Sequence, residues 1–260
     1  IFNATDELIL RSKELADKYG VGVHMHIAEA KAEVEYARET RGVTTVTHLN
    51  NLGFLDKNVI AAHAVWLTNE EVEMFRKHQV KVSHNPASAM RVLGFAKIPR
   101  MLREGVCVAL GTDGAPTNNR MNMVDEMWVT SLIHKGWRLE PDAVKEEEIL
   151  AMATINGARA VGDEGICGSL EAGKKADLII IDPDCSVDML PIHDPIANLV
   201  TSMHSTNIES TMCDGKWLMK DRKLLTIDEE EIIREGKEHA REICRRGGIK
   251  LPERFPVKRR

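Results

Sequence analysis

Four short apolar runs alternate with amphipathic helical patterns through the first 110 residues of this 260-residue chain. The runs cover residues 21–27, 59–65, 80–83 and 106–110, and the helical patterns between them cover 31–40, 69–78 and 98–104. Strands that alternate with helices and are apolar on both faces indicate parallel pairing in a buried sheet. The sequence therefore predicts an α/β fold built from repeated strand–helix units.

Different patterns flank this region. A helix is expected at 6–19, and another at 146–161 with an inner stripe of Ile149, Met152, Ala153 and Ala160. A turn-rich stretch then precedes a strand at 178–181, and Asp214-Gly215 predicts a hairpin turn within 209–219. A charged helix follows at 228–246, and Lys258-Arg259-Arg260 reads as a solvated tail. We expect three parts: 1–162, a small β module at 163–226, and a C-terminal helix and tail at 227–260.

Composition narrows the classes of protein that the chain can represent. With 43% hydrophobic and 29% charged residues it can build a core, and its net charge of −5 offers no basic footprint for nucleic acid or an anionic membrane. No run approaches the ~20 apolar residues of a membrane helix. The five cysteines are odd in number and widely spaced, which argues against a disulfide framework. We expect a cytoplasmic protein that binds neither nucleic acid nor membrane.

Polar clusters follow each of the four predicted strands. They are His26 with Glu29, His63, the Ser-His-Asn run at 83–85, and Asp113. In parallel α/β folds the carboxyl ends of the strands meet at one mouth, where chemistry collects. Imidazole and carboxylate groups suit Zn²⁺ or Fe²⁺, which makes a metal site one interpretation. The alternatives are a hydrogen-bonded core histidine at 26 and a helix-capping aspartate at 113.

Taken together, these motifs resemble the amidohydrolase superfamily, and within it the branch of 5-methylthioadenosine/S-adenosylhomocysteine deaminases and triazine hydrolases. The resemblance extends over nearly the whole chain and depends on the joint order of the motifs, since any one of them alone is weak. The motifs are His26-Ile27-Ala28-Glu29, Ala62-His63-Ala64, Ser83-His84-Asn85-Pro86-Ala87-Ser88, Leu110-Gly111-Thr112-Asp113-Gly114-Ala115 with Asn118-Asn119, and Gly168-Ser169-Leu170-Glu171 with Ala176-Asp177-Leu178.

The resemblance implies a role for each clustered residue. His26 and Asp113 match the metal ligands of the fifth and eighth strands of a (β/α)₈ TIM barrel that holds one Zn²⁺, or Fe²⁺ in some relatives. Asp113 would also accept a proton from water, Glu29 would contact the substrate and act as general acid, and His63 would direct the attacking water. His84 either contacts substrate or belongs to a hydrogen-bonded turn that closes its strand.

One departure from the family pattern changes the expected extent of the fold. The family's first-strand His-x-His ligand pair should lie well upstream of His26, and nothing before His24 contains it. The four strands here would be strands 5 to 8 of a barrel of ~250 residues, followed by part of a small β-sandwich. We expect a C-terminal portion, completed by a missing N-terminal portion or by a second copy in a homo-oligomer. Ala89 also replaces the Asn of many relatives, which leaves the substrate contacts of its loop open.

The resemblance implies a metal-dependent hydrolase that deaminates an amino-purine compound, such as 5-methylthioadenosine or S-adenosylhomocysteine, by metal-hydroxide attack and ammonia release. One alternative on the same scaffold is a triazine hydrolase that removes chloride or an alkylamine. Another is an inactive truncated chain that needs a partner to complete the site. The expected ligand is a small amino-heterocycle in each enzymatic case.

Overall fold

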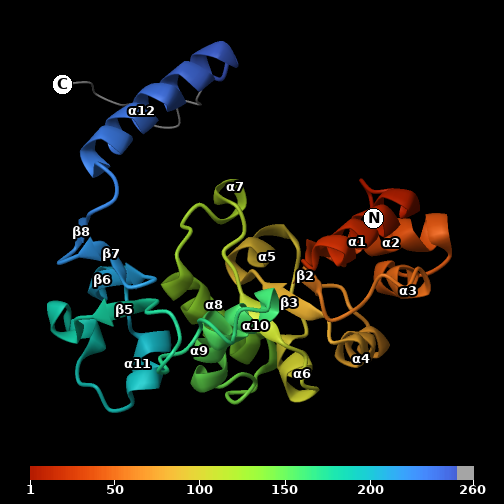
Figure 1. Cartoon of the computed structure of the whole chain (residues 1–260), viewed down its shortest axis with the longest axis horizontal. Coiled ribbons are helices and arrows are strands. Elements are labelled where there is room, and N and C mark those ends of the chain that lie inside the picture. The colour runs from red at the N-terminus through yellow and green to blue at the C-terminus, as the bar shows by residue number, and fades with distance from the viewer. Residues whose placement is uncertain (251–260) are drawn as a thin grey trace.

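The computed structural model describes residues 1–250, so the basic tail at 258–260 lies outside the described residues. Two four-stranded sheets organise the chain, with helices around the first of them (Figure 1). The first sheet is parallel, and its strands pair in chain order. Its strands are β1 (Val23–Ile27), β2 (Val59–His63), β3 (Lys81–His84) and β4 (Val108–Leu110). The predicted α/β class and the parallel pairing are confirmed.

Helices connect and follow the parallel strands. The amphipathic patterns at 31–40, 69–78 and 98–104 correspond to α2 (Lys31–Arg41), α4 (Asn69–His78) and α6 (Ile98–Arg103). The other helices of this part are α1 (Asp6–Tyr19), α3 (Thr45–Asn51), α5 (Pro86–Val92), α7 (Ala115–Asn118), α8 (Met123–Arg138), α9 (Glu146–Ala153) and α10 (Ile155–Val161).

The parallel sheet has one covered face and one more open face. In register, Ile27 pairs with His63 and His84 pairs with Leu110; all four residues are buried, and Ile27, His84 and Leu110 lie on the face that the helices cover. Phe75 of α4 lies in the same core cluster as Ile27 and Leu110. On the opposite face His24 and His26 are exposed and Ser83 is half-buried. The expectation that every strand is buried on both faces is therefore wrong for the described chain.

The second sheet is antiparallel and lies in the expected β module. It contains β5 (Leu178–Ile181), β6 (Ile208–Cys213), β7 (Lys216–Lys220) and β8 (Lys223–Leu224). The hairpin between β6 and β7 turns at Asp214 and Gly215, whose φ values of 49° and 76° suit a two-residue type I′ turn. The segment between β5 and β6 holds three 3₁₀ turns, η1 (Pro183–Cys185), η2 (Val187–Met189) and η3 (Ser205–Asn207), and α11 (Pro195–Thr201).

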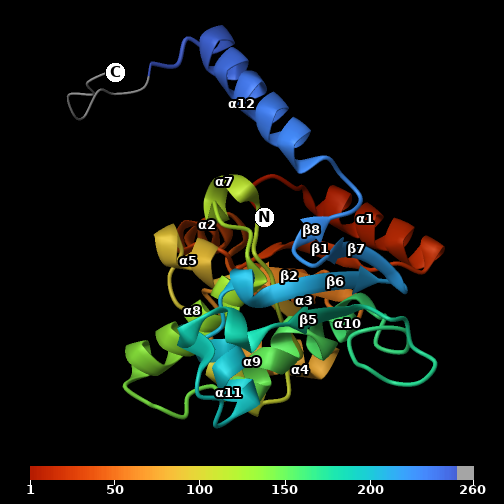
Figure 2. The same ribbon diagram turned by 90° about the vertical axis from the view of Figure 1, so that its left-hand side faces the viewer.

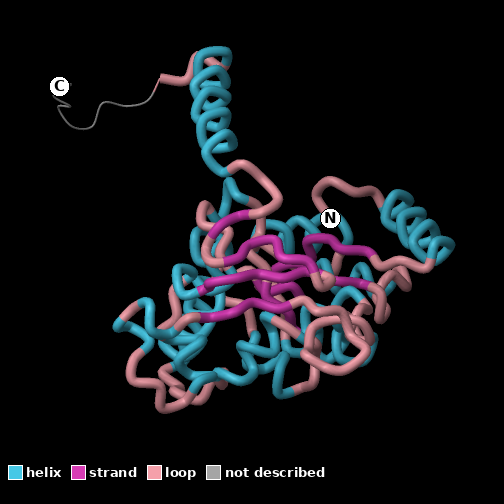
Figure 3. Tube along the Cα trace, turned by 60° about the vertical axis from the view of Figure 1, so that its left-hand side comes forward, coloured by secondary structure: helices cyan, strands magenta, loops and turns pink. Residues whose placement is uncertain are grey.

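The last described helix, α12 (Glu229–Arg246), projects from the end of the second sheet in two views and in the tube trace (Figures 1, 2 and 3). Its N-cap Asp228 accepts a hydrogen bond from the backbone N–H of Glu231, and none of its residues is buried. The prediction of an exposed helix over 228–246 is confirmed. Among the described residues, none of the helices combines the length and the apolar character needed to cross a membrane.

One element differs from its prediction. The single helix expected over 146–161 is two helices, because Thr154 leaves the helical region with φ −130° and ψ −99° between α9 and α10. The expected inner stripe survives the break, since Ile149, Met152 and Ala160 are all buried and Ala153 is half-buried. Both halves therefore keep their part of the stripe turned to the interior.

Candidate active site

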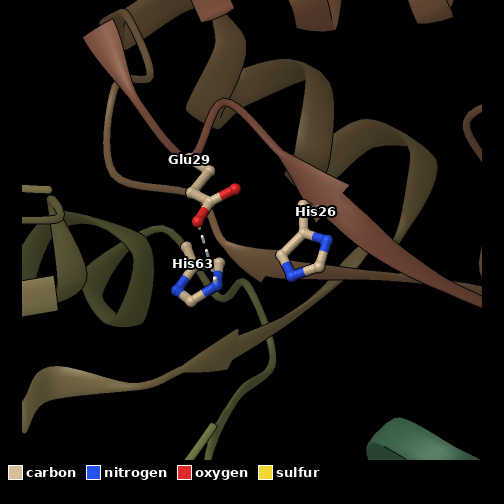
Figure 4. A group of neighbouring side chains, drawn as sticks. All are labelled: His26, Glu29 and His63. Carbon is tan, nitrogen blue, oxygen red and sulfur yellow. Dashed lines mark ion pairs between the residues drawn. The ribbon is translucent and has the colours of Figure 1, made fainter. Parts of the chain in front are cut away.

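His26 and Glu29 come from the end of β1 and the loop that follows it. His26 is the fourth residue of the strand and faces the open side of the sheet, and Glu29 lies just beyond the strand end. The ring of His26 stacks against that of His63 from β2, with centroids 5.3 Å apart and an interplanar angle of 11°. Figure 4 shows the Glu29 carboxylate and the two rings gathered around one space.

The backbone conformation of His63 changes the direction in which its side chain points. Its register with Ile27 belongs to the helix-covered face, yet a φ of 70° at the strand end brings its Nε2 atom 3.8 Å from Oε1 of Glu29 and 3.9 Å from Oδ2 of Asp113. Only 1% of the residue is exposed. Burial lowers the pKa of His63 below its ordinary value, although the carboxylates of Glu29 and Asp113 act in the opposite direction.

Asp113 is held in the loop after β4 by two short hydrogen bonds. The Ser88 hydroxyl donates to its Oδ2 at 2.5 Å, and the Gly114 backbone N–H donates to its Oδ1 at 2.5 Å. Partial burial alone would raise the pKa of the Asp113 carboxyl, but these bonds to the charged form outweigh it and the pKa lies below its ordinary value. Asp113 is therefore an ionised group that can bind a cation or accept a proton.

Left-handed backbone conformations gather at three of the four strand ends. Ala28 after β1, His63 and Ala64 at the end of β2, and Asp113 after β4 have φ values of 52°, 70°, 49° and 64°. For residues with a side chain, such conformations cost on the order of 1–3 kcal/mol each and persist only where the surrounding structure enforces them. Their concentration around one cluster of titratable side chains supports an interpretation of this edge as a functional site.

Glu33 supports the β1 end, and its role was not predicted from the sequence. Its carboxylate is buried and accepts the backbone N–H of Ala28 at 2.9 Å and that of Glu29 at 2.8 Å. The available signal was its position in the first turn of α2, where a glutamate commonly reaches back to N–H groups before the helix. Glu33 thereby fixes the loop that presents Glu29.

Glu126 and Asn118 form a second buried support that was not predicted as one. The Glu126 carboxylate accepts the Ala87 backbone N–H at 3.1 Å and the Asn118 side-chain amide at 2.6 Å. The same amide nitrogen donates to the backbone carbonyl of Thr112 at 2.7 Å, next to Asp113. The network therefore links α8 to the first turn of α5 and to the loop that carries Asp113.

A cavity of about 320 Å³ opens at these strand ends. Residues of β1, β2 and β3 and of the loops after β3 and β4 line it, among them His24, His26, His63, Ser83, Asn85 and Asp113. His84 is not among its lining residues. It is fully buried on the other face of β3, where its Nε2 atom lies 3.1 Å from Nε2 of His134 on α8. This placement favours the interpretation of His84 as part of a hydrogen-bonded strand end, and a contact with substrate stays a prediction.

The donor set fits a transition-metal cation. One ligand atom each from His26, Glu29 and His63 lies within 4.8 Å of the others, and Asp113 adjoins this trio through its 3.9 Å approach to His63. Two imidazoles with adjacent carboxylates are ligands that Zn²⁺ and Fe²⁺ accept. The structure thus brings together four of the five predicted site residues, His26, Glu29, His63 and Asp113, and leaves His84 behind the sheet.

Comparison with known proteins agrees with this arrangement. Residues 2–218 match the model of the amidohydrolase family. The chain belongs to this family. It is 39% identical over 244 residues to the 5'-deoxyadenosine deaminase of Methanobrevibacter smithii and 40% identical over 243 residues to the 5-methylthioadenosine/S-adenosylhomocysteine deaminase of Aquifex aeolicus. Each alignment covers 93% of this chain and 56% of the relative, so the chain spans about half the length of the curated relatives it matches.

Two solved structures superpose closely on this chain and support the same fold assignment. An adenosine deaminase from Xanthomonas campestris with bound zinc superposes with a TM-score of 0.91 at 28% identity, over 93% of this chain and 55% of that one. The zinc complex of the atrazine chlorohydrolase from Arthrobacter aurescens superposes with a TM-score of 0.85 at 27% identity, over 90% of this chain and 52% of that one. The zinc in each case is bound to the neighbouring protein.

Proposed function

We propose that the protein containing these residues is a metal-dependent hydrolytic deaminase of an amino-purine nucleoside, such as 5'-deoxyadenosine, 5-methylthioadenosine or S-adenosylhomocysteine. The observation that carries the proposal is the convergence of two imidazoles, His26 and His63, with the carboxylates of Glu29 and Asp113 at the carboxyl edge of a parallel sheet. The named activities of relatives at 39% and 40% identity supply the substrate class.

In this proposal His26 and Asp113 hold a divalent cation, Zn²⁺ or Fe²⁺. The cation would lower the pKa of a bound water to about 7 and so make hydroxide available at neutral pH. Zinc in the superposed Xanthomonas structure supports this choice of cofactor. In this proposal a further strand would pair with the other edge of β1 and supply the remaining ligands, since β1 pairs along only one of its edges among the described strands.

The residues of the chain then divide the proton transfers between them. Asp113 accepts the proton released from the attacking water, and His63 hydrogen-bonds that oxygen and directs it at the ring carbon that bears the amino group. Glu29 donates a proton to the adjacent ring nitrogen. Asp113 then passes its proton to the amino group and Glu29 takes back the proton of the added hydroxyl group, so that the tetrahedral carbon expels ammonia and leaves a carbonyl on the ring.

The architecture fits the same proposal. The strands β1 to β4 would be strands 5 to 8 of a (β/α)₈ barrel within residues 1–162, and the sheet of residues 163–226 would be part of a small β-sandwich. Exposed Ile179 on β5 supports the second assignment, because a completed sandwich would cover the face of the sheet on which it lies. The other half of the barrel would be a further segment or a second copy of the chain.

The proposed function is tested by assaying the whole protein that contains these residues for ammonia release and for the loss of purine ultraviolet absorbance. Metal content is measured in parallel. We expect turnover of amino-purine nucleosides, and Glu29→Gln should lower it by roughly 10² to 10⁴ while metal content stays unchanged. The matched control is Glu35→Gln, on the exposed side of α2.

Two results would contradict the proposal. Preferential release of chloride or alkylamine from triazines would support the second candidate, which the superposition on the atrazine chlorohydrolase favours. A whole protein without metal and without turnover of any amino-heterocycle would support a partner-binding chain instead.

A further inference from the structure

Asn85 occupies a helix-capping position but does not cap its helix. It is the N-cap residue of α5, and an asparagine there commonly accepts a hydrogen bond from the second or third backbone N–H of the helix. The Asn85 side chain makes no such bond. The N–H of Ala87, the second residue of α5, donates instead to Oε2 of Glu126 at 3.1 Å. The amide of Asn85 is therefore free for another role.

This amide lies in the wall of the cavity at the strand ends. The Ser83 hydroxyl donates to its Oδ1 at 3.0 Å, and both residues line the cavity. Gly111, directly after β4, leaves the space that the amide occupies. A Cβ at this glycine would lie 2.6 Å from Oδ1 of Asn85 and 2.9 Å from Oγ of Ser83. The lack of a side chain at 111 therefore lets the amide pack against the neighbouring strand end.

The nitrogen of this amide has no acceptor among residues 1–250. Asn85 is 5% exposed, and its hydrogen bond with Ser83 engages only the oxygen. In the described part of the chain, the fully enclosed side-chain atoms that lack a partner do not include Nδ2 of Asn85, so the nitrogen is reached from the cavity that Asn85 lines. Because buried polar groups are normally paired, an amide donor left open at a cavity indicates a ligand-binding group.

We propose that Asn85 is a specificity-determining residue, which donates a hydrogen bond from Nδ2 to the N7 atom of the amino-purine ring. The inference deepens the proposed function and rests on it for the substrate class. It assigns to the chain a contact with a part of the ring that takes no part in the proton transfers described above.

The order of the strands selects N7. Glu29 follows β1, His63 ends β2 and Asn85 follows β3, so Glu29 and Asn85 lie on opposite sides of His63. In the proposed reaction His63 directs water at the carbon that bears the amino group, and Glu29 protonates the ring nitrogen bonded to that carbon. On the other side of this carbon a purine carries N7, which is a hydrogen-bond acceptor. A donor on the β3 side of the cavity matches it.

The test compares two substrates of the whole protein that contains these residues. One is an adenosine-type nucleoside, and the other is its 7-deaza analogue, in which a C–H group replaces N7. The value of kcat/KM for ammonia release is measured for both; for an analogue that binds without turnover, the inhibition constant is compared instead. Each substrate is compared with itself between the original protein and a variant, so the intrinsic reactivity of the analogue cancels.

We expect Asn85→Ala to lower kcat/KM for the purine roughly 3- to 10-fold, the effect of one neutral hydrogen bond, and to leave the value for the analogue nearly unchanged. Asn85→Asp keeps the shape of the side chain and an acceptor for the Ser83 hydroxyl, but it replaces the donor with a second acceptor. It should lower the value for the purine at least as much and again spare the analogue.

Asn58→Ala is the matched control. Asn58 is exposed just before β2, at the end of the strand opposite to the cavity, and it does not line the cavity. Neither substrate should be affected by this change.

Equal losses with both substrates would overturn the inference, because a structural role of Asn85 disturbs every substrate alike. Unchanged kcat/KM for the purine in the variants would overturn it as well. If Asn85→Ala does not fold, Asn85→Asp decides. Turnover by the original protein with equal losses in the variants removes this inference alone and leaves the deaminase proposal intact. An original protein that releases ammonia from no amino-purine removes both.

Discussion

Acid should destabilise the fold through His134 well before it protonates the carboxylates. Burial lowers the pKa of this imidazole from 6.5 to about 3, whereas the unfolded chain binds the proton near 6.5. Between these two values the unfolded state holds more protons, so stability is lost as the pH falls and is fully present above 6.5. At about 1.4 kcal/mol for each tenfold change, the whole effect is roughly 5 kcal/mol, of which about 2 kcal/mol is lost by pH 5.

The assay is urea unfolding followed by tryptophan fluorescence at about pH 7.5 and about pH 5, for the original chain and for His134→Gln. The glutamine amide can still donate to His84 but does not titrate, so the variant should lose about 2 kcal/mol less between the two pH values. His239→Gln, on the exposed surface of α12, is the control and should keep the original dependence. Equal losses in the original chain and in His134→Gln would refute the reasoning.

Three further substitutions test the supports of the site and one exposed helix by urea unfolding. Glu33→Gln should cost about 1–3 kcal/mol, because one of two buried backbone N–H groups loses its acceptor, while Glu35→Gln on the same helix should cost little. Gly111→Ala should cost about 1–3 kcal/mol, since its Cβ would lie 2.6 Å from Oδ1 of Asn85. Gly236→Ala meets no atom within 4 Å and should stabilise α12 by about 1 kcal/mol, and a loss of stability there would contradict the helix assignment.

Much of the fold follows from local signals in the sequence. The helix predicted over 69–78 is α4, whose capping box joins Thr68 and Glu71 within one turn. The hairpin at Asp214-Gly215 needs only two left-handed residues in succession. The break at Thr154 has no comparable local signal: α9 and α10 both pack against β4, a contact between distant parts of the chain that no local pattern records. Sequence periodicity continues across it and therefore predicts one helix.

The candidate site was predictable in its outline and not in its supports. Because parallel strands end at one edge, His26, Glu29, His63 and Asp113 could be placed together from strand order alone. The acceptor that fixes the Glu29 loop and the hydroxyl that binds Asp113 depend on distances between elements, which no spacing in the chain reveals. His84 and His63 both end their strands at the same register position. His84 keeps its side chain on the helix-covered face, whereas the left-handed backbone of His63 turns its side chain toward the cavity, and the sequence does not reveal this difference.

Two of the strained strand ends have a buried polar support from a helix. The Glu33 carboxylate on α2 binds the N–H groups at the end of β1, and the Ser88 hydroxyl on α5 binds the aspartate after β4. If left-handed conformations cost on the order of 1–3 kcal/mol each, these supports must together offset several kcal/mol to keep the site assembled. Loss of one support should therefore release the side chain at its own strand end first, because the other strand end keeps its own.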